Sequence, residues 1–303
     1  MGNKENNIKK PGVKTLSIHH GETFSEETGC VMPPIFSTST FKYGNKQNFD
    51  YTRSGNPNFK ILENILKSIE DSKYCTVFGS GISAVTAITS TLKSGDKILC
   101  ESNLYGCTVR MFDKIFKKFG IEVFYTDFTN KESIKRVKEF QPTLIWLESP
   151  TNPLLKILDI KSICDEANKH KIPVVLDNTF TTALIQKPLE LGATLSLIST
   201  TKFINGHSDA LGGAVLTNDK EWNSKMLFSQ KALGLQPSPF DSWLITRGVK
   251  TLPLRIEQQT KSAEIISKEF ENHRIIRKAL YPFNQKHQQF NLAKSQMKSG
   301  GSM

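Results

Sequence analysis

The sequence predicts an α/β protein built on a mainly parallel sheet that is covered by helices on both faces. Short apolar runs alternate with segments whose apolar residues recur at helical spacing, and turn-forming residues separate them. This alternation is typical of parallel strands joined by crossover helices, where ligands gather at the carboxyl ends of the strands. The 303 residues allow a sizeable core and either one large domain or two ordinary ones.

The first 58 residues differ from the rest of the chain. A polar tail over residues 1–14 precedes an arm over residues 15–58 that is rich in Pro, Gly, Ser and Thr. Paired prolines and an Asn-Pro step favour extended, irregular backbone over a packed element. We therefore expect a disordered tail and an N-terminal arm outside the packed domain.

The alternating pattern begins at Phe59 with a helix predicted over residues 59–69. Strands are predicted at 75–78, 97–100, 121–125, 143–147 and 174–177, and further helices at 82–93, 108–119, 131–140 and 160–170. From Leu252 to Phe270 the spacing predicts one long amphipathic helix, and the run that follows predicts a strand over 274–281. The organisation is thus an α/β domain over 59–250, followed by a linking helix and further structure over 251–303.

The net charge of +11 raises the question of nucleic-acid binding. The surplus is concentrated at the two ends, with +3 in residues 1–14 and nine basic against four acidic residues in 251–303. A nucleic-acid groove needs clustered cations and aromatic stacking platforms, so solvated ends explain the charge better. We expect no nucleic-acid partner.

Cysteine usage and the N-terminus point to the cytoplasm. The five cysteines are odd in number and include no C-x-x-C pair or metal-ligand spacing, which indicates reduced thiols and no metal site. The N-terminus lacks the apolar core of a signal peptide, and Asn6 does not fit a myristoylation motif. No apolar run is long enough to span a membrane, so no membrane partner is expected.

Three groups of residues suggest chemistry. Gly79 to Val85 read G-S-G-I-S-A-V, and glycines that open a helix expose N–H groups to an anion such as phosphate, although a tight turn explains them equally well. Asp177 ends an apolar strand and needs a partner, which is either a cationic ligand atom or a helix cap or salt bridge. Each signal is weak alone.

The third group surrounds Lys202, which lies in an apolar and hydroxyl-rich stretch. A buried lysine can lose its proton near neutral pH and form an imine with a carbonyl, whereas a solvated lysine at a strand end is the alternative. The neighbouring hydroxyls of Ser199 and Thr201 suit a phosphate. Together these residues form one coherent set, with an amine that can react with a carbonyl and hydroxyls that can bind a phosphate.

From about Thr15 to the last residue, the chain resembles the Cys/Met-metabolism (transsulfuration) family of pyridoxal-phosphate (PLP) enzymes. This family includes cystathionine γ-synthase, cystathionine γ-lyase and methionine γ-lyase. The resemblance rests on seven motifs in order: Y-T-R-S-G-N-P (51–57), G-S-G-I (79–82), L-Y-G-C-T (104–108), L-E-S-P-T-N-P (147–153), L-D-N-T-F (176–180), S-T-T-K-F-I-N-G-H-S-D (199–209) and P-S-P-F-D-S-W-L-I-T-R-G-V-K-T-L (237–252). It implies the type I PLP-dependent transferase (aspartate-aminotransferase-like) fold, with a seven-stranded sheet and residues 59–250 as the PLP-binding domain.

The resemblance also implies roles for individual residues. Lys202 would hold PLP covalently, and Asp177 would pair with the protonated ring nitrogen, which keeps the ring an electron sink. Tyr105 would stack on the ring and Asn152 would lie near its phenolic oxygen. The phosphate would be held by Gly81 and Ile82 through their backbone and by Ser199 and Thr201.

Two further residues imply an oligomer. In this family the residues at Tyr51 and Arg53 reach the phosphate of the neighbouring subunit, and Arg53 is either such a bidentate phosphate partner or an ordinary surface arginine. The resemblance therefore implies a homo-oligomer, a tetramer formed as a dimer of dimers, with shared active sites and small amino acids as substrates.

Other conspicuous residues are interpreted as structural. His207 is expected to be hydrogen-bonded at a turn, and Trp146 and Trp243 to lie in the core. Cys107 either lines the pocket, as a cysteine does in methionine γ-lyases, or is a small buried filler.

The reaction that the resemblance favours is a cystathionine γ-synthase-like γ-replacement, in which cysteine replaces the γ substituent of an O-acylhomoserine, in methionine and cysteine metabolism. L-Y-G-C-T points instead toward methionine γ-lyase, so γ-elimination by a cystathionine γ-lyase or methionine γ-lyase is the alternative. Family members continue past the G-G motif into a C-terminal domain with the arginine for the substrate carboxylate. Residues 251–303 are therefore expected to hold only the start of that domain, and a truncated, non-catalytic PLP-binding remnant is a further alternative.

Overall fold

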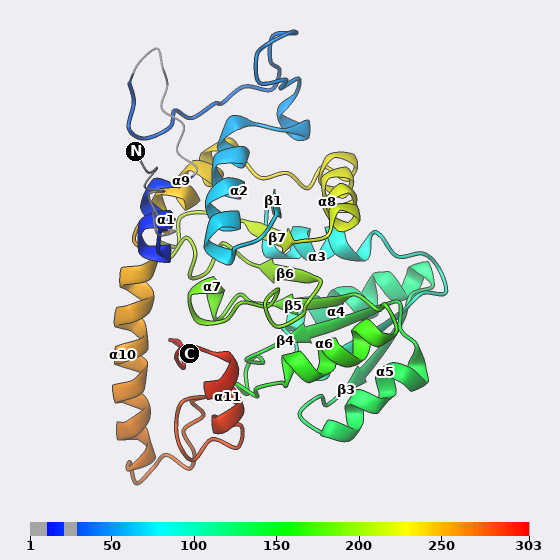
Figure 1. The fold of residues 1–303 in the computed structure, drawn as a ribbon, viewed down its shortest axis with the longest axis vertical. Coiled ribbons are helices and arrows are strands. Elements are labelled where there is room, and N and C mark those ends of the chain that lie inside the picture. Colours follow the sequence, from blue (N-terminus) through cyan, green and yellow to red (C-terminus); the bar gives the residue numbers. More distant parts are fainter. Residues whose placement is uncertain (1–10, 21–28, 303) are drawn as a thin grey trace, which may run out of the picture.

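A computed structural model describes residues 11–20 and 29–302 of the chain. Its strands are β1 (Tyr74–Phe78), β2 (Lys97–Glu101), β3 (Glu122–Thr126), β4 (Leu144–Glu148), β5 (Val174–Asp177), β6 (Leu195–Ile198) and β7 (Gly213–Thr217). They form one seven-stranded sheet in the order β1-β7-β6-β5-β4-β2-β3 (Figure 1). β7 runs antiparallel to its neighbours β1 and β6, and the other neighbouring pairs are parallel. The predicted fold class is confirmed.

Helices cover both faces of the sheet (Figure 1). The α-helices are α1 (Val13–His19), α2 (Pro57–Glu70), α3 (Gly81–Thr89), α4 (Gly106–Lys114), α5 (Lys135–Phe140), α6 (Ile160–Lys169), α7 (Thr182–Ile185), α8 (Lys220–Ala232), α9 (Pro239–Val249), α10 (Leu252–Glu271) and α11 (Phe290–Gln296). Short 3₁₀ helices are η1 (Thr52–Ser54), η2 (Phe116–Phe119) and η3 (Lys131–Ile134).

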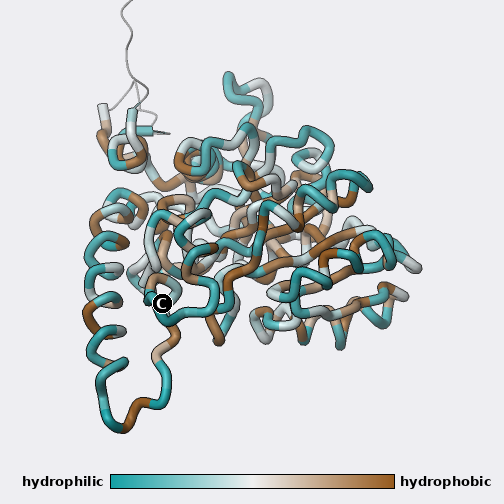
Figure 2. The backbone as a smooth tube through the Cα atoms, turned by 60° about the horizontal axis from the view of Figure 1, so that its bottom comes forward, coloured by the Kyte–Doolittle hydropathy of each residue, from teal (hydrophilic) through white to brown (hydrophobic). Residues whose placement is uncertain are grey.

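Successive side chains of each strand point to opposite faces of the sheet, so alternate residues pack into separate parts of the core. On β4, Leu144 and Trp146 pack with residues of α3, α4 and α8, whereas Ile145 and Leu147 pack with residues of α5 and α6. The residues of β1 and β7 that face α2 and α9 form a further cluster. Hydrophobic residues accordingly gather in the sheet, whereas α10 is largely hydrophilic (Figure 2).

β1 is an edge strand, and side chains, not another strand, form hydrogen bonds with backbone groups on its outer edge. The Val77 N–H donates to Glu63 Oε1 (3.3 Å), and Gln230 Nε2 donates to the Val77 carbonyl. These contacts from α2 and α8 cover polar groups that an edge strand would otherwise expose for pairing with another chain.

The predicted elements over 59–177 are present with small shifts of their ends. The helix predicted at 108–119 is divided, because α4 ends at Lys114 and η2 continues the chain. The strand predicted over 274–281 is wrong. Ile275 is 77% exposed and only Tyr281 at the end of the segment is buried, and no described strand lies beside the segment, so it has no ladder partner.

The N-terminal prediction holds only in part. Residues 1–10 of the predicted tail, including Asn6, and residues 21–28 of the arm lie outside the described residues. Within the described part, α1 is a helix where irregular backbone was expected, and Lys14 on it forms an ion pair with Glu257 of α10 (3.1 Å). The arm over 29–51 is irregular, as predicted.

The segment after α10 returns to the sheet domain (Figure 1). Gln296 on α11 donates to the Leu158 carbonyl (2.9 Å), and the Lys298 N–H donates to the Ile185 carbonyl (2.9 Å). Across the described residues, no helix has the length and apolar character needed to cross a membrane.

Candidate active site

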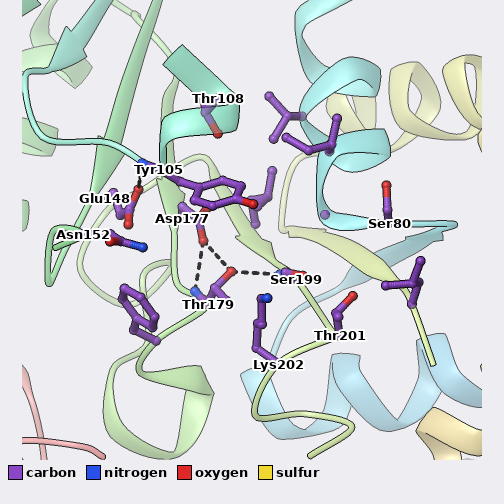
Figure 3. A pocket seen from close by; sticks show the side chains of 16 residues that line it. Ser80, Tyr105, Thr108, Glu148, Asn152, Asp177, Thr179, Ser199, Thr201 and Lys202 are labelled. Carbon is purple, nitrogen blue, oxygen red and sulfur yellow. Dashed lines mark hydrogen bonds between the residues drawn. The ribbon is translucent and has the colours of Figure 1, made fainter. Parts of the chain in front are cut away.

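A cavity of about 380 Å³ lies at the carboxyl ends of the central strands (Figure 3). It is lined by Ser80, Gly81, Ile82, Val85, Tyr105, Thr108, Glu148, Asn152, Asp177, Thr179, Phe180, Leu197, Ser199, Thr201, Lys202 and Leu211. The structure thus brings together eight of the ten predicted site residues from five separate segments. Tyr51 and Arg53 are not among them.

One side of the cavity is built from backbone N–H groups and hydroxyls. The first turn of α3 begins at Gly81, and its N–H groups have no partner within the helix. Ser80 caps this helix by accepting the Ser83 N–H (3.0 Å). A side chain at Gly81 would lie 2.9 Å from Ser199 Cβ, so glycine is required for α3 to approach the end of β6.

Thr201 lies on the same side, beside Gly212. Its hydroxyl donates to the Gly212 carbonyl (3.2 Å) and accepts the Gly212 N–H (3.0 Å), which fixes the chain just before Lys202 to the start of β7. The helix start and the hydroxyls of Ser199 and Thr201 form an anion-binding set.

The opposite side carries Asp177 at the end of β5. Its carboxylate accepts hydrogen bonds from the Thr179 hydroxyl (2.6 Å) and N–H (3.0 Å), and the Ser199 N–H in turn donates to the Thr179 hydroxyl (2.8 Å). Burial raises the pKa of Asp177, and the two hydrogen bonds from Thr179 lower it. Thr179 was not among the predicted site residues, because its contacts depend on the turn after β5.

Glu148 was also missed, although it lies directly across from Asp177 in the β4–β5 register. It accepts the Tyr105 N–H (2.7 Å) and so holds the start of α4 against the cavity. Burial and the negative charge of Asp177 raise the pKa of Glu148 to about 9, so it is protonated at neutral pH. Asp177 is then the carboxyl that bears the negative charge of the site.

Lys202 extends between the two sides, with its amine directed into the cavity (Figure 3). Its Nζ makes no hydrogen bond or ion pair to another described residue. Tyr105 lies across the cavity from it and is 41% exposed (Figure 3). A second hollow of about 760 Å³ shares Phe180, Thr201, Lys202 and Leu211 with the cavity, so the two hollows meet at Lys202.

Three residues near the cavity have structural contacts. His207 bonds through Nδ1 to the Asn205 carbonyl (2.6 Å), which confirms its predicted structural role. Cys107 does not line the cavity and is half-buried, with Arg110 Nη2 2.9 Å from its Sγ, so neither expectation for it is met. A hydrogen bond from Tyr105 and the nearby Arg110 guanidinium lower the pKa of the Cys107 thiol.

The two predicted core tryptophans differ. Trp146 is buried against Phe112, as predicted. Trp243 is only half-buried, because its indole lies toward the arm and donates to the Pro33 carbonyl (2.9 Å).

Tyr51 and Arg53 lie on the arm, away from the cavity of their own chain. Arg53 Nη1 donates to the Lys231 carbonyl on α8 (2.9 Å), and its guanidinium lies 5.4 Å from the centre of the Tyr51 ring. Both side chains remain at the surface.

The cavity fits pyridoxal phosphate in its chemistry. It offers an anion-binding side for a phosphate, an unpaired amine for an aldehyde, a carboxylate for a ring N–H⁺ and an aromatic face for the ring. Among the described residues no group of three or more metal-binding side chains occurs.

Residues 14–303 match the model of the family described as Cys/Met metabolism PLP-dependent enzyme. A probable cystathionine gamma-synthase of Herpetosiphon aurantiacus is 39% identical over 295 residues, which are 96% of this chain and 92% of that protein. A cystathionine gamma-lyase of Dictyostelium discoideum is 38% identical over 98% of this chain and 77% of its own length.

A solved structure of a cystathionine gamma synthase is also similar to this chain. The crystal structure of cystathionine gamma synthase from Xanthomonas oryzae pv. oryzae, in complex with aminoacrylate and cysteine, matches with a TM-score of 0.94. It is 34% identical, and the match covers 97% of this chain and 77% of that one.

Proposed function

The chain belongs to the Cys/Met metabolism family of PLP-dependent enzymes, and from this premise we propose that it is a cystathionine γ-synthase. In the proposed reaction, cysteine replaces the acyloxy group of an O-acylhomoserine. The Cγ–O bond breaks, a Cγ–S bond forms, and the acyloxy group leaves as a carboxylic acid that carries off the thiol proton. The broader assignment, a PLP-dependent enzyme of sulfur amino-acid metabolism, follows from the family and the relatives.

The observation that carries the proposal is the position of Lys202. Its unpaired amine lies where the cavity meets the adjoining hollow, so one base can serve two organic substrates that enter side by side. The extent of the match to a probable cystathionine gamma-synthase adds support.

Bound pyridoxal phosphate supplies an electron-accepting ring that stabilises negative charge on the substrate carbons. We assign the phosphate to Ser199, Thr201 and the first turn of α3, and the ring N–H⁺ to Asp177. Tyr105 and Asn152 also line the cavity, where Tyr105 would cover the ring face and Asn152 would interact with the phenolic oxygen of the ring.

In this assignment Lys202 has a second task besides holding the cofactor. Its Nζ takes the proton from Cα of the amino acid and returns protons to the substrate as the γ substituent is exchanged. Thr179 donates two hydrogen bonds to the Asp177 carboxylate that favour its ionised form, which would serve as the counter-ion of the ring N–H⁺.

We further infer that residues 59–250 are the PLP-binding domain and that the chain works in the cytoplasm as a homotetramer in methionine biosynthesis. The exposed positions of Tyr51 and Arg53 support an active site shared with a second subunit, since neither side chain reaches the cavity of its own chain.

The direct test is turnover by the purified chain with pyridoxal phosphate. We expect cystathionine from cysteine with O-succinylhomoserine or O-acetylhomoserine, and loss of both visible cofactor absorbance and turnover in Lys202→Ala. Lys114→Ala, which removes an exposed lysine on α4, is the matched control. Ammonia release from cystathionine without cystathionine synthesis would instead identify a lyase, and cofactor binding without any turnover would identify a non-catalytic protein.

A further inference from the structure

The motif over residues 237–252 has no role in the cavity, yet it packs against the loop that follows Lys202. This motif forms α9 and the start of α10. Arg255, in the first turn of α10, extends its guanidinium into the loop over residues 203–206. The contact joins a distant part of the sequence to the backbone that carries Lys202.

The Arg255 guanidinium is bound almost entirely by carbonyl oxygens. Nη1 donates to the Phe203 carbonyl (2.7 Å), and Nη2 donates to the carbonyls of Ile204 (3.0 Å) and Gly248 (2.9 Å). Nε donates to the Thr251 hydroxyl (3.0 Å). Burial lowers the pKa of Arg255, but an arginine keeps its charge, so its hydrogen bonds are charge-assisted.

Two glycines make room for this arrangement. Gly206 has a φ of +73°, and a Cβ there would lie 1.9 Å from Arg255 Nη1. A Cβ at Gly248 would lie 2.4 Å from the Asn205 carbonyl. A side chain at Gly206 would displace the Arg255 guanidinium of α10, and a side chain at Gly248 would push α9 away from the loop, so the glycines and the arginine form one packed unit.

We propose that Arg255 is a positioning residue that fixes the backbone after Lys202 and thereby aims the Lys202 amine into the cavity. It holds the two carbonyls that directly follow the lysine, and the Gly206 N–H closes the turn by donating to the Lys202 carbonyl (2.8 Å). Because misplacing a reacting group by about 1 Å can cost about 100-fold in rate, a mobile loop would weaken the site without removing any group that touches substrate.

The inference rests on the proposed role of Lys202, so the first measurement is made without cofactor. Arg255→Met and Arg255→Lys are compared with Arg247→Met, which removes an exposed guanidinium from α9. In the cofactor-free protein, amide hydrogen exchange should rise at Asn205 and Gly206 in Arg255→Met and remain unchanged in the control. Arg255→Lys keeps the positive charge but loses the planar set of guanidinium N–H donors, so it should show an intermediate rise in hydrogen exchange.

The second measurement adds pyridoxal phosphate. We expect Arg255→Met to bind it about 10- to 100-fold more weakly, the range that supporting partners of a site typically control, and to shift the pH at which the lysine-bound cofactor changes its visible absorption. Arg255→Lys should retain part of the affinity, and it carries the test if Arg255→Met does not fold.

Two results would overturn the inference. One is exchange that increases evenly over the whole chain, since this marks a general stabilising role. The other is unchanged affinity and unchanged absorption in both Arg255 variants. If the unmodified chain binds no cofactor, the proposed function fails, whereas the exchange measurement still decides whether Arg255 holds the loop.

Discussion

At the residue scale, the cavity depends on small residues as much as on reactive ones. Gly81 lets the first turn of α3 approach Ser199, and Gly213 lets β7 pass Ser80, where a Cβ would lie 2.3 Å from the Ser80 carbonyl. The anion-binding side therefore exists only because these positions carry no side chain.

The first prediction concerns Gly81. In Gly81→Ala the new Cβ would lie 2.9 Å from Ser199 Cβ and 3.0 Å from Ser199 Oγ, so α3 and the end of β6 must move apart. We expect a loss of about 1–3 kcal/mol in the free energy of unfolding and at least about tenfold weaker cofactor binding. Urea unfolding and absorbance titration measure the two effects.

Gly12→Ala is the control, because a Cβ at Gly12 meets no atom within 4 Å. Equal cofactor affinity in Gly81→Ala and Gly12→Ala would contradict this account of the phosphate side.

Single residues of the site were predictable to the extent that their local sequence suggested chemistry. Lys202 and Asp177 could be singled out because a charged side chain at the end of an apolar strand needs an explanation. Glu148 ends the apolar strand β4 in the same way, so the same signal was available for it but was not used, and its register opposite Asp177 became clear only in the structure. Thr179 could not be singled out, because its importance arises from one hydrogen bond across the turn. Such contacts leave no local pattern.

At the scale of elements, periodicity predicted the strands and helices over residues 59–177 because each has a buried face, whereas the strands and helices between Leu195 and Val249 were not predicted. It failed at residues 274–281, where apolar residues occur in a surface segment without a strand beside it. It also missed α1, whose seven residues are stabilised by contact with α2 and α10 more than by their own sequence.

Helix α2 carries a buried carboxyl that predicts a pH effect. Glu70 is 1% exposed, and neither carboxyl oxygen has a hydrogen-bond partner. Burial raises the pKa of Glu70 to about 8, although the nearby Lys187 lowers it. The folded state therefore binds more protons than the unfolded state, and stability falls as the pH rises from about 4.5 to about 8.

Glu70→Gln should remove this effect. We expect the wild type to lose up to about 1.4 kcal/mol per pH unit in that window from this group, and the variant to be the more stable protein at pH values above the window. Chemical unfolding on both sides of the window measures it. The exposed Glu139→Gln is the control, and an identical pH dependence in Glu70→Gln and the wild type would rule out the explanation.

Helix α11 and the segment before it hold the loop that carries Asn152. His287 Nε2 donates to the Leu155 carbonyl (3.2 Å), and its Nδ1 accepts the Gln289 N–H (3.2 Å). This pair of bonds requires the neutral ring. Burial and the charge of Lys278 lower the pKa of His287, so its contribution to stability is present above the ordinary histidine pKa of 6.5 and is lost as the pH falls below it.

His287→Leu should therefore cost about 1–2 kcal/mol of unfolding free energy at a pH above 7 and progressively less in acid. The exposed His273→Leu serves as the control. A cost that stays constant across this pH range would show that packing of the ring, rather than its hydrogen bonds, holds the loop.

At the scale of the whole molecule, the reversed strand β7 completes the site. It starts at Gly213, next to Gly212 that binds Thr201, and it runs back between β1 and β6. The antiparallel strand thus brings the start of β7 to the edge where the parallel strands end. The sequence pattern predicted a mainly parallel sheet but not this reversal, because no strand was predicted over residues 195–217 and the direction of β7 depends on the loop that joins it to β6.

The proposed role of Arg53 on the N-terminal arm involves a second subunit. Arg53 is held at the surface by α8, outside the cavity, so its proposed phosphate contact requires a second subunit. In a dimer with shared sites, each site takes Lys202 from one subunit and Arg53 from the other. Two inactive variants, Lys202→Ala and Arg53→Ala, should then complement each other when they are mixed.

The expected recovery follows from symmetry. After equal amounts of the two variants are unfolded and refolded together, half of the dimers are hybrids, and each hybrid has one site with both residues intact. Turnover should therefore return to about a quarter of the wild-type value. If Arg53 instead served its own chain, both sites of a hybrid would lack a residue, and activity would not exceed that of Arg53→Ala alone. Because the two outcomes differ in kind, the mixing experiment decides between a shared site and a surface arginine.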